Sequence, residues 1–156
     1  MERFKLNPDI FNDRLVFVSN NDVWEVSIEG GKAQRITSGI GVINNVRYSP
    51  DGKRLVFRVM RGYDASYADI YGYDFKSGKL SRLTYLSGKS TSRRMYTDMA
   101  GWDEMGNPVI STDVLSPFTA QTFHWFDPDL YPGYVYLLFS KLKIIFTRLP
   151  DFRQEK

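Results

Sequence analysis

The chain of 156 residues contains no cysteine and a single histidine, His124. Without cysteine it can form no disulfide, no thiolate zinc site and no cysteine nucleophile. One histidine leaves only carboxylates as further metal ligands. These absences exclude thiol redox chemistry and cysteine-based metal binding, and we expect no cofactor.

Signals for secretion, membrane insertion and nucleic-acid binding are also missing. Residues 1–14 show no apolar core and no small-residue cleavage site of a signal peptide, which favours a cytoplasmic location. The apolar run from Tyr134 to Phe146 is interrupted by Lys141 and Lys143 and is shorter than the roughly 20 residues that cross a bilayer. The net charge of +3 forms no basic stripe. We therefore expect no membrane and no nucleic-acid partner.

The chain does contain a pattern that occurs twice. Residues 14–17, RLVF, recur 40 positions later as residues 54–57. Further on the offset is 47, so that the second copy carries seven extra residues within RVMRGYDASYA, as a surface loop tolerates. Repeats at such a spacing predict one structural unit per copy, stacked on its neighbour. The pairs at the larger offset are Asp22 and Asp69, Trp24 and Tyr71, Gly31 and Gly78, Lys32 and Lys79, Arg35 and Arg82, Thr37 and Thr84.

Each copy is expected to form about four short antiparallel strands. Apolar and polar residues alternate in both copies, which is typical of a strand with one buried face. The sequence SPDG at 49–52 predicts a turn before a strand from Lys53 to Met60. A third copy begins at residues 102–106 and continues with PVIST at 108–112. The apolar positions of the alternation are Trp24, Val26 and Ile28 in the first copy and Tyr71, Tyr73 and Phe75 in the second.

These repeats predict an all-β fold, an incomplete β-propeller of about two and a half four-stranded blades. The blade repeats lie near residues 13–38, 48–85 and 102–123 of a domain covering 1–123. A β-sandwich is the alternative, but it does not require the turns and the Arg-aliphatic-Thr ending to recur in register. Residues 124–156 form a divergent tail, and its abrupt departure suggests the hypothesis of a frameshift or truncation.

The blade phrase YSPDGKRLVF resembles the blades of TolB and dipeptidyl-peptidase-like propellers. Three further stretches, NPDI at 7–10, Gly41 to Gly62 and Leu86 to Asp113, closely resemble the first propeller of the tricorn protease family. This resemblance covers roughly residues 5–123. It implies a six-bladed propeller in a much longer chain, followed by a second propeller and by helical, PDZ-like and catalytic domains in a hexameric ring. Such an assembly trims oligopeptides released by the proteasome, and its catalytic residues lie in later domains, so this chain alone is expected to be non-catalytic.

The resemblance also implies a substrate contact at Arg93 and Arg94, which would anchor the C-terminal carboxylate of a peptide. Guanidinium groups suit this role because their donors form a rigid fork. Neighbouring residues of an extended strand point to opposite faces, so both can bind one carboxylate only if the backbone twists. The alternative is a solvated basic loop.

Other motifs predict no active site. LSGKST at 86–91 resembles the end of a phosphate-binding loop, but Leu83 stands where the first glycine is required, and GIG at 39–41 is better interpreted as a turn. His124 has Ser111, Ser116 and Asp113 near it in sequence, yet no G-x-S-x-G elbow accompanies them, which leaves a small hydrolase as the weakest interpretation.

The remaining candidates are acidic and aromatic residues. Asp64, Asp69 and Asp74 are spaced by five, unlike a calcium-binding loop. Tyr63 and Tyr67 lie in the inserted loop and are candidate contacts, whereas Tyr71 and Tyr73 are expected in the core.

An incomplete propeller leaves an open sheet edge and an uncovered face. We therefore expect peptides or proteins as partners, together with a homo-oligomer or a partner chain that supplies the missing blades. The alternative to a peptidase fragment is a stand-alone propeller-like interaction module that self-assembles.

Overall fold

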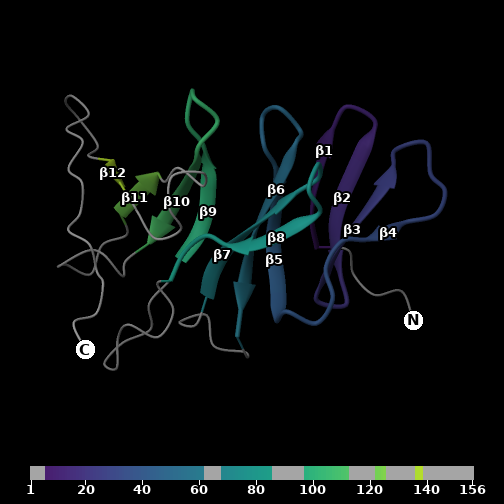
Figure 1. The fold of residues 1–156 in the computed structure, drawn as a ribbon, viewed down its shortest axis with the longest axis horizontal. Coiled ribbons are helices and arrows are strands. Elements are labelled where there is room, and N and C mark those ends of the chain that lie inside the picture. The colour runs from purple at the N-terminus through teal and green to yellow at the C-terminus, as the bar shows by residue number, and fades with distance from the viewer. Residues whose placement is uncertain (1–5, 62–67, 86–96, 113–121, 126–135, 139–156) are drawn as a thin grey trace.

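The computed structural model describes residues 6–61, 68–85, 97–112, 122–125 and 136–138. In these ranges the strands form three antiparallel four-stranded sheets that follow one another across the molecule in chain order (Figure 1). This confirms the predicted all-β, partial-propeller architecture. The first sheet contains β1 (Leu6–Phe11), β2 (Arg14–Ser19), β3 (Asp22–Ser27) and β4 (Gln34–Arg35). The second contains β5 (Val42–Tyr48), β6 (Arg54–Met60), β7 (Ala68–Asp74) and β8 (Lys79–Arg82). The third contains β9 (Thr97–Trp102), β10 (Pro108–Thr112), β11 (Thr122–Trp125) and β12 (Tyr136–Leu138).

The sheets begin upstream of the matching sequence, which starts near residues 13, 48 and 102. The first strands β1, β5 and β9 share little sequence, so the repeat is visible only from the second strand of each sheet onward. The third sheet also has a fourth strand, since β12 pairs with β11 inside the segment expected to be a divergent tail.

The repeat extends to the backbone of the first strands. Asn7 in β1 and Asn45 in β5 have φ values of 50° and 54°. Each lies where the pairing with the second strand shifts, which marks a β-bulge. Asparagine adopts this left-handed conformation more readily than most residues. The two bulges therefore occupy equivalent places in the two sheets.

The sheets pack face to face, and because successive side chains of a strand point to opposite faces, one strand can contribute to two cores. Val16, Val18 and Val23 of the first sheet lie in one core with Leu55 and Phe57 of the second. The next position along β6, Val56, points to the other face and packs with Ile70, Leu83, Met99 and Ile110. The strand β6 is therefore buried on both faces, which explains its continuous apolar sequence.

The predicted buried face of β3 was wrong in part. Ile28, just after β3, is 51% exposed, whereas Val23, on the opposite phase, is fully buried. The reason is that the Val23 face meets the second sheet, while no described sheet covers the Trp24 face. In the second sheet the equivalent residues Tyr71 and Tyr73 are partly buried against the first core, as expected.

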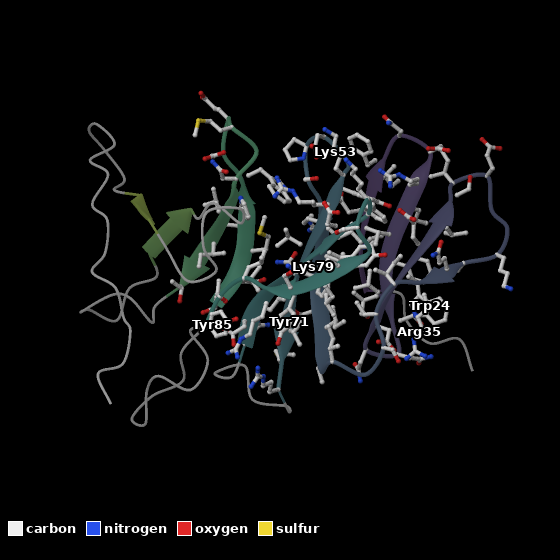
Figure 2. All side chains as sticks on the ribbon, viewed as in Figure 1. Trp24, Arg35, Lys53, Tyr71, Lys79 and Tyr85 are labelled. Carbon is white, nitrogen blue, oxygen red and sulfur yellow. The ribbon has the colours of Figure 1, made fainter. Side chains whose placement is uncertain are left out.

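The recurring Arg-aliphatic-Thr ending binds a buried aspartate. In the first sheet Arg35 forms an ion pair with Asp22, at 2.5 Å, and Thr37 donates to the other carboxylate oxygen at 3.1 Å. The Thr37 hydroxyl in turn accepts the Val23 amide at 2.9 Å. Figure 2 shows Arg35 beside Trp24, whose ring centre is 5.9 Å from the guanidinium carbon. This network joins β3 to the segment that leaves β4.

The second sheet repeats the network atom for atom. Arg82 pairs with Asp69 at 2.5 Å, Thr84 donates to Asp69 at 3.0 Å, and the Ile70 amide donates to the Thr84 hydroxyl at 2.9 Å. Asp69 is 1% exposed, so its charge requires these partners. The repeated motif is thus a structural clasp.

Candidate functional site

The predicted peptide contact, Arg93 and Arg94, lies outside the described residues. In the sequence the pair stands between the end of β8 and the start of β9 at Thr97. Tyr63, Tyr67 and the phosphate-loop-like segment 86–91 also lie outside the described ranges. The contact role of these residues stays a prediction.

The predicted catalytic and metal candidates are only partly described. His124 lies in β11, where its Cα pairs with Ile110 and Leu137. Ser116, Asp113 and Asp64 lie outside the described residues, while Ser111 is buried in β10. Among the described residues no group of three histidine or acidic side chains could hold a metal ion. No helix in the described part of the chain is long and apolar enough to span a membrane.

The first strands of the three sheets line a cavity of about 440 Å³. Asn45 connects two of these strands, since its amide donates to the Asp98 carboxylate at 2.6 Å and to the Met99 carbonyl at 3.1 Å. Asp9 connects β1 to β5 by accepting the Tyr48 amide at 2.8 Å. These bonds place polar groups from three sheets around one opening. The lining comprises Asp9, Ile10, Phe11, Asn45, Arg47, Tyr48, Ser49, Pro50, Met99, Ala100, Gly101 and Trp102.

The chemistry of this lining suits binding. It offers a guanidinium from Arg47, a carboxylate from Asp9 and the apolar surfaces of Phe11 and Met99. The Ser49 hydroxyl already donates to a carboxylate in its own turn, at 2.7 Å, and the lining contains no histidine that could act as its base. Such a wall can hold a peptide through hydrogen bonds, charge and apolar contact.

Beside this cavity the first and second sheets are joined by an aromatic cage around Arg14. The guanidinium carbon of Arg14 lies 5.5, 5.0 and 4.8 Å from the ring centres of Phe11, Tyr48 and Phe75. Glu25 accepts from the Tyr48 hydroxyl at 2.6 Å and faces Arg14 at 3.4 Å. Burial, and then the hydrogen bond to Glu25, raise the pKa of Tyr48 far above its ordinary range.

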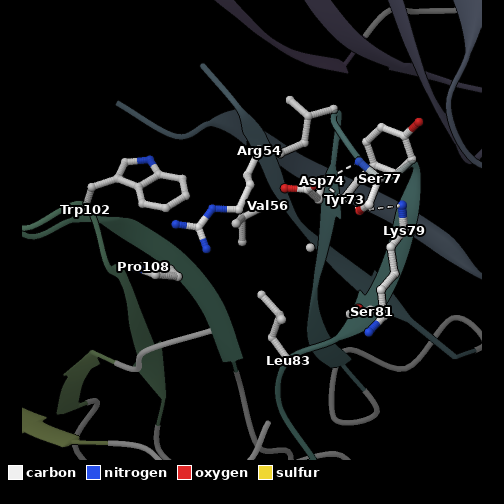
Figure 3. Close-up of a pocket in the computed structure, with 12 residues that line it drawn as sticks. Arg54, Val56, Tyr73, Asp74, Ser77, Lys79, Ser81, Leu83, Trp102 and Pro108 are labelled. Atoms are coloured by element: carbon white, nitrogen blue, oxygen red, sulfur yellow. Dashed lines mark hydrogen bonds between the residues drawn. The ribbon is translucent and has the colours of Figure 1, made fainter. Parts of the chain in front are cut away.

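A second cavity, of about 320 Å³, opens between the second and third sheets (Figure 3). Arg54 and Lys79 contribute positive charges, and Trp102 and Leu83 contribute apolar surface. This cavity was not predicted from the sequence. The available signal was Gly72, which stands at the repeat position of Glu25 and removes a side chain from the space between the sheets.

Antiparallel four-stranded sheets, packed face to face and repeating one register, define a β-propeller type of domain. The family described as "Tricorn protease N-terminal beta propeller domain" matches residues 2–127. The chain belongs to this family.

Individual relatives agree. The tricorn protease of Thermoplasma acidophilum is 49% identical over 122 residues, which make up 78% of this chain and 11% of that protein. The crystal structure of the tricorn protease superimposes with a TM-score of 0.76 at 44% identity, covering 88% of this chain and 13% of that one. TolB from Acinetobacter baumannii superimposes with a TM-score of 0.63 at 20% identity, over 89% of this chain and 33% of that one, and shares the fold alone. The chain thus spans about a tenth of the length of the Thermoplasma acidophilum protein.

Proposed function

We propose that this chain is a non-catalytic part of the N-terminal propeller of a tricorn-type serine peptidase. In this role it shapes the wall of the substrate chamber and contacts peptides, while other domains supply the catalytic residues. The observation that carries the proposal is the 49% identity to a tricorn protease over 78% of the chain. Such a peptidase works in the cytoplasm on oligopeptides that the proteasome releases.

Two features of the chain support a contact with peptides. The cavity between β1, β5 and β9 presents charged, amide and apolar groups on one wall, which matches the mixed chemistry of a peptide. Arg93 and Arg94 are the candidates for the C-terminal carboxylate, because two adjacent guanidinium groups can bind it with several charge-assisted hydrogen bonds.

The test compares a fluorescent hexapeptide with a free C-terminus and the same peptide with a C-terminal amide, both measured by anisotropy. We expect the double variant Arg93→Ala/Arg94→Ala to bind the free-acid peptide about tenfold or more weakly and to bind the amide peptide with unchanged affinity. The reason is that a charged hydrogen bond contributes roughly 1.5–3 kcal/mol. The exposed pair Lys53→Ala/Lys76→Ala is the matched control for charge. Equal affinity of the variant for acid and amide, with wild-type values for both, would contradict the carboxylate contact.

A stand-alone propeller-like module that self-assembles is the second candidate. The Trp24 face of the first sheet favours it, since no described sheet covers this face. The DNA sequence around the gene separates the two functions. Blade strands and catalytic domains that resume in another reading frame beyond residue 124 support a peptidase fragment, whereas their absence supports the module.

A further inference from the structure

The cavity between the second and third sheets is the structural equivalent of a space that is filled between the first and second. In the filled case the Glu25 carboxylate lies between two sheets and meets the Tyr48 hydroxyl and the Arg14 guanidinium. Glu25 pairs across the sheet with Val16. The side chain of Glu25 thus neutralises a cation from its own sheet and binds a ring from the next.

The cation and the ring of this arrangement recur between the second and third sheets, whereas the position of Glu25 has no side chain there. Arg54 takes the place of Arg14 in the repeat, and Trp102 takes the place of Tyr48. Gly72 is at the position of the second repeat that corresponds to Glu25 in the first. It pairs with Val56 as Glu25 pairs with Val16. A Cβ at Gly72 would meet the side chain of Leu83 at 3.0 Å, so Leu83 borders the vacated space.

The vacated space is open and charged. Figure 3 shows Arg54 reaching from β6 toward the side of the cavity formed by Trp102 and Pro108, whereas Lys79 belongs to β8 on the opposite side. The lining of the cavity contains two cations and one carboxylate, Asp74, which is attracted to Arg54. Both the hydroxyl and the amide of Ser77 donate to Asp74 at 2.7 Å, and these bonds lower its pKa, so it stays ionised at neutral pH. The positive charges outnumber the negative one, which favours an anion.

We propose that this cavity binds a carboxylate attached to a large apolar group, about the size of one amino-acid residue. The carboxylate takes the place that Glu25 has in the first repeat, near Arg54 and Lys79, and the apolar group lies against Leu83 and Trp102. The volume of about 320 Å³ is at the lower end of small-molecule sites, which suits a single residue and excludes a nucleotide-sized ligand. The carboxylate can come from a peptide C-terminus or from an acidic side chain beside an apolar residue.

Titrations of the full-length chain with three probes test the proposal by isothermal calorimetry and by Trp fluorescence. N-acetylphenylalanine has the carboxylate and the ring, N-acetylphenylalaninamide has only the ring, and acetate has only the carboxylate. We expect a Kd on the order of 1 mM for the acid and values at least about tenfold weaker for the other two. N-acetyl-aspartyl-phenylalaninamide carries its carboxylate on a side chain, so its affinity relative to the acid tells which source the cavity accepts.

Variants locate the binding. Lys79→Gln is expected to weaken the binding of N-acetylphenylalanine several-fold. Lys32→Gln, at the equivalent position of the first repeat, is expected to have no effect, because that repeat has the carboxylate of Glu25 between the sheets. Arg54→Gln is expected to weaken the binding of N-acetylphenylalanine by about tenfold. Gly72→Glu is expected to abolish this binding, because the new side chain supplies the carboxylate that Glu25 supplies in the first repeat. Lys79 is exposed, so its variant keeps the test valid if Gly72→Glu fails to fold.

Equal binding of the acid and the amide, no binding at about 20 mM, or wild-type affinity of both Lys79→Gln and Arg54→Gln would overturn the proposal. The site is separate in sequence from Arg93 and Arg94. The double variant of that pair is therefore expected to bind N-acetylphenylalanine normally, whatever the role of the pair in the parent peptidase.

Discussion

Gly52 lies directly against the aromatic ring of Phe11, so closely that a Cβ at position 52 would collide with the ring carbons. Gly52 ends the turn that precedes β6, and Phe11 ends β1, so this contact joins the turn of the second sheet to the first sheet. Gly52 also accepts a bond from Arg14, whose Nη2 donates to its carbonyl at 2.6 Å. One residue without a side chain thus permits the aromatic cage to close.

Gly52→Ala tests this contact. Two costs add: a φ of 67° is unfavourable for alanine by about 1–2 kcal/mol, and overpacking against Phe11 adds about 1–3 kcal/mol. Gly106→Ala is the matched control, because Gly106 has a φ of 80° and nothing within 4 Å of its Cβ position. Urea unfolding is expected to show that Gly52→Ala lowers the free energy of unfolding by more than Gly106→Ala does. Equal losses would mean that Phe11 moves aside freely.

The two clasps differ in burial and therefore in energy. The side chain of Arg82 is 21% exposed and that of Arg35 is 47% exposed, while their aspartates are nearly buried. Arg82→Gln leaves Asp69 without its cation in a poorly hydrated site, and we expect it to lower the free energy of unfolding by about 2–3 kcal/mol. Arg35→Gln leaves Asp22 nearer to water and is expected to cost about 1 kcal/mol. The reverse order in chemical denaturation would show that the exposed fractions of the arginines do not set the energy.

Low pH is expected to reduce the free energy of unfolding, because two aspartates in turns become protonated. The hydroxyl of Ser49 holds the pKa of Asp51 below its ordinary value, and the hydroxyl of Ser77 does the same for Asp74. A carboxylate whose pKa is lower when folded contributes stability that is complete above its unfolded pKa, near 4, and is lost as the pH falls through the folded value. The urea midpoint should therefore fall below about pH 4 in the wild type, and less steeply in Asp51→Asn/Asp74→Asn. An unchanged pH profile in the double variant would count against these turn bonds.

Self-association is expected through the uncovered face of the first sheet. The corresponding face of the second sheet, with Tyr71 and Tyr73, packs against the first core, so the chemistry of this face is that of an interface. Ile28 lies on that side and is 51% exposed, so a charged side chain at this position is tolerated by the fold. Ile28→Lys is expected to lower the apparent mass in sedimentation velocity, whereas Met105→Lys, at a residue 77% exposed on a turn, leaves it unchanged. A monodisperse wild-type monomer would refute the expectation.

Much of the fold could be predicted because the repeat is strong where strands pair closely. The offsets of 40 and 47 residues relate Phe17 to Phe57 and Trp24 to Tyr71. In the structure Phe17 pairs with Trp24 as Phe57 pairs with Tyr71. The first strands could not be found this way, since NPDIF and VINNVRY share a bulge and not a sequence. The buried face of each strand was also difficult to predict, because alternation shows which residues share a face but not which face packs against a neighbouring sheet.

One of the candidate sites was predicted from the sequence and another was not. Arg93 and Arg94 were found through resemblance of their sequence context, and they remain a prediction. The cavity beside Gly72 was not found, although the sequence already held the exchange of Glu25 for glycine. A missing side chain becomes a cavity only when neighbouring sheets come together and fail to fill the space.

The sequence by itself determined the strands that repeat, their turns, the clasp residues and the family, because local periodicity, turn chemistry and long shared phrases are properties of the chain. The tertiary structure alone decided which face of each strand is buried, where three first strands enclose a cavity, and why Asp22 and Asp69 recur. These features depend on contacts between strands and between sheets, which form when residues far apart in the chain exclude water together.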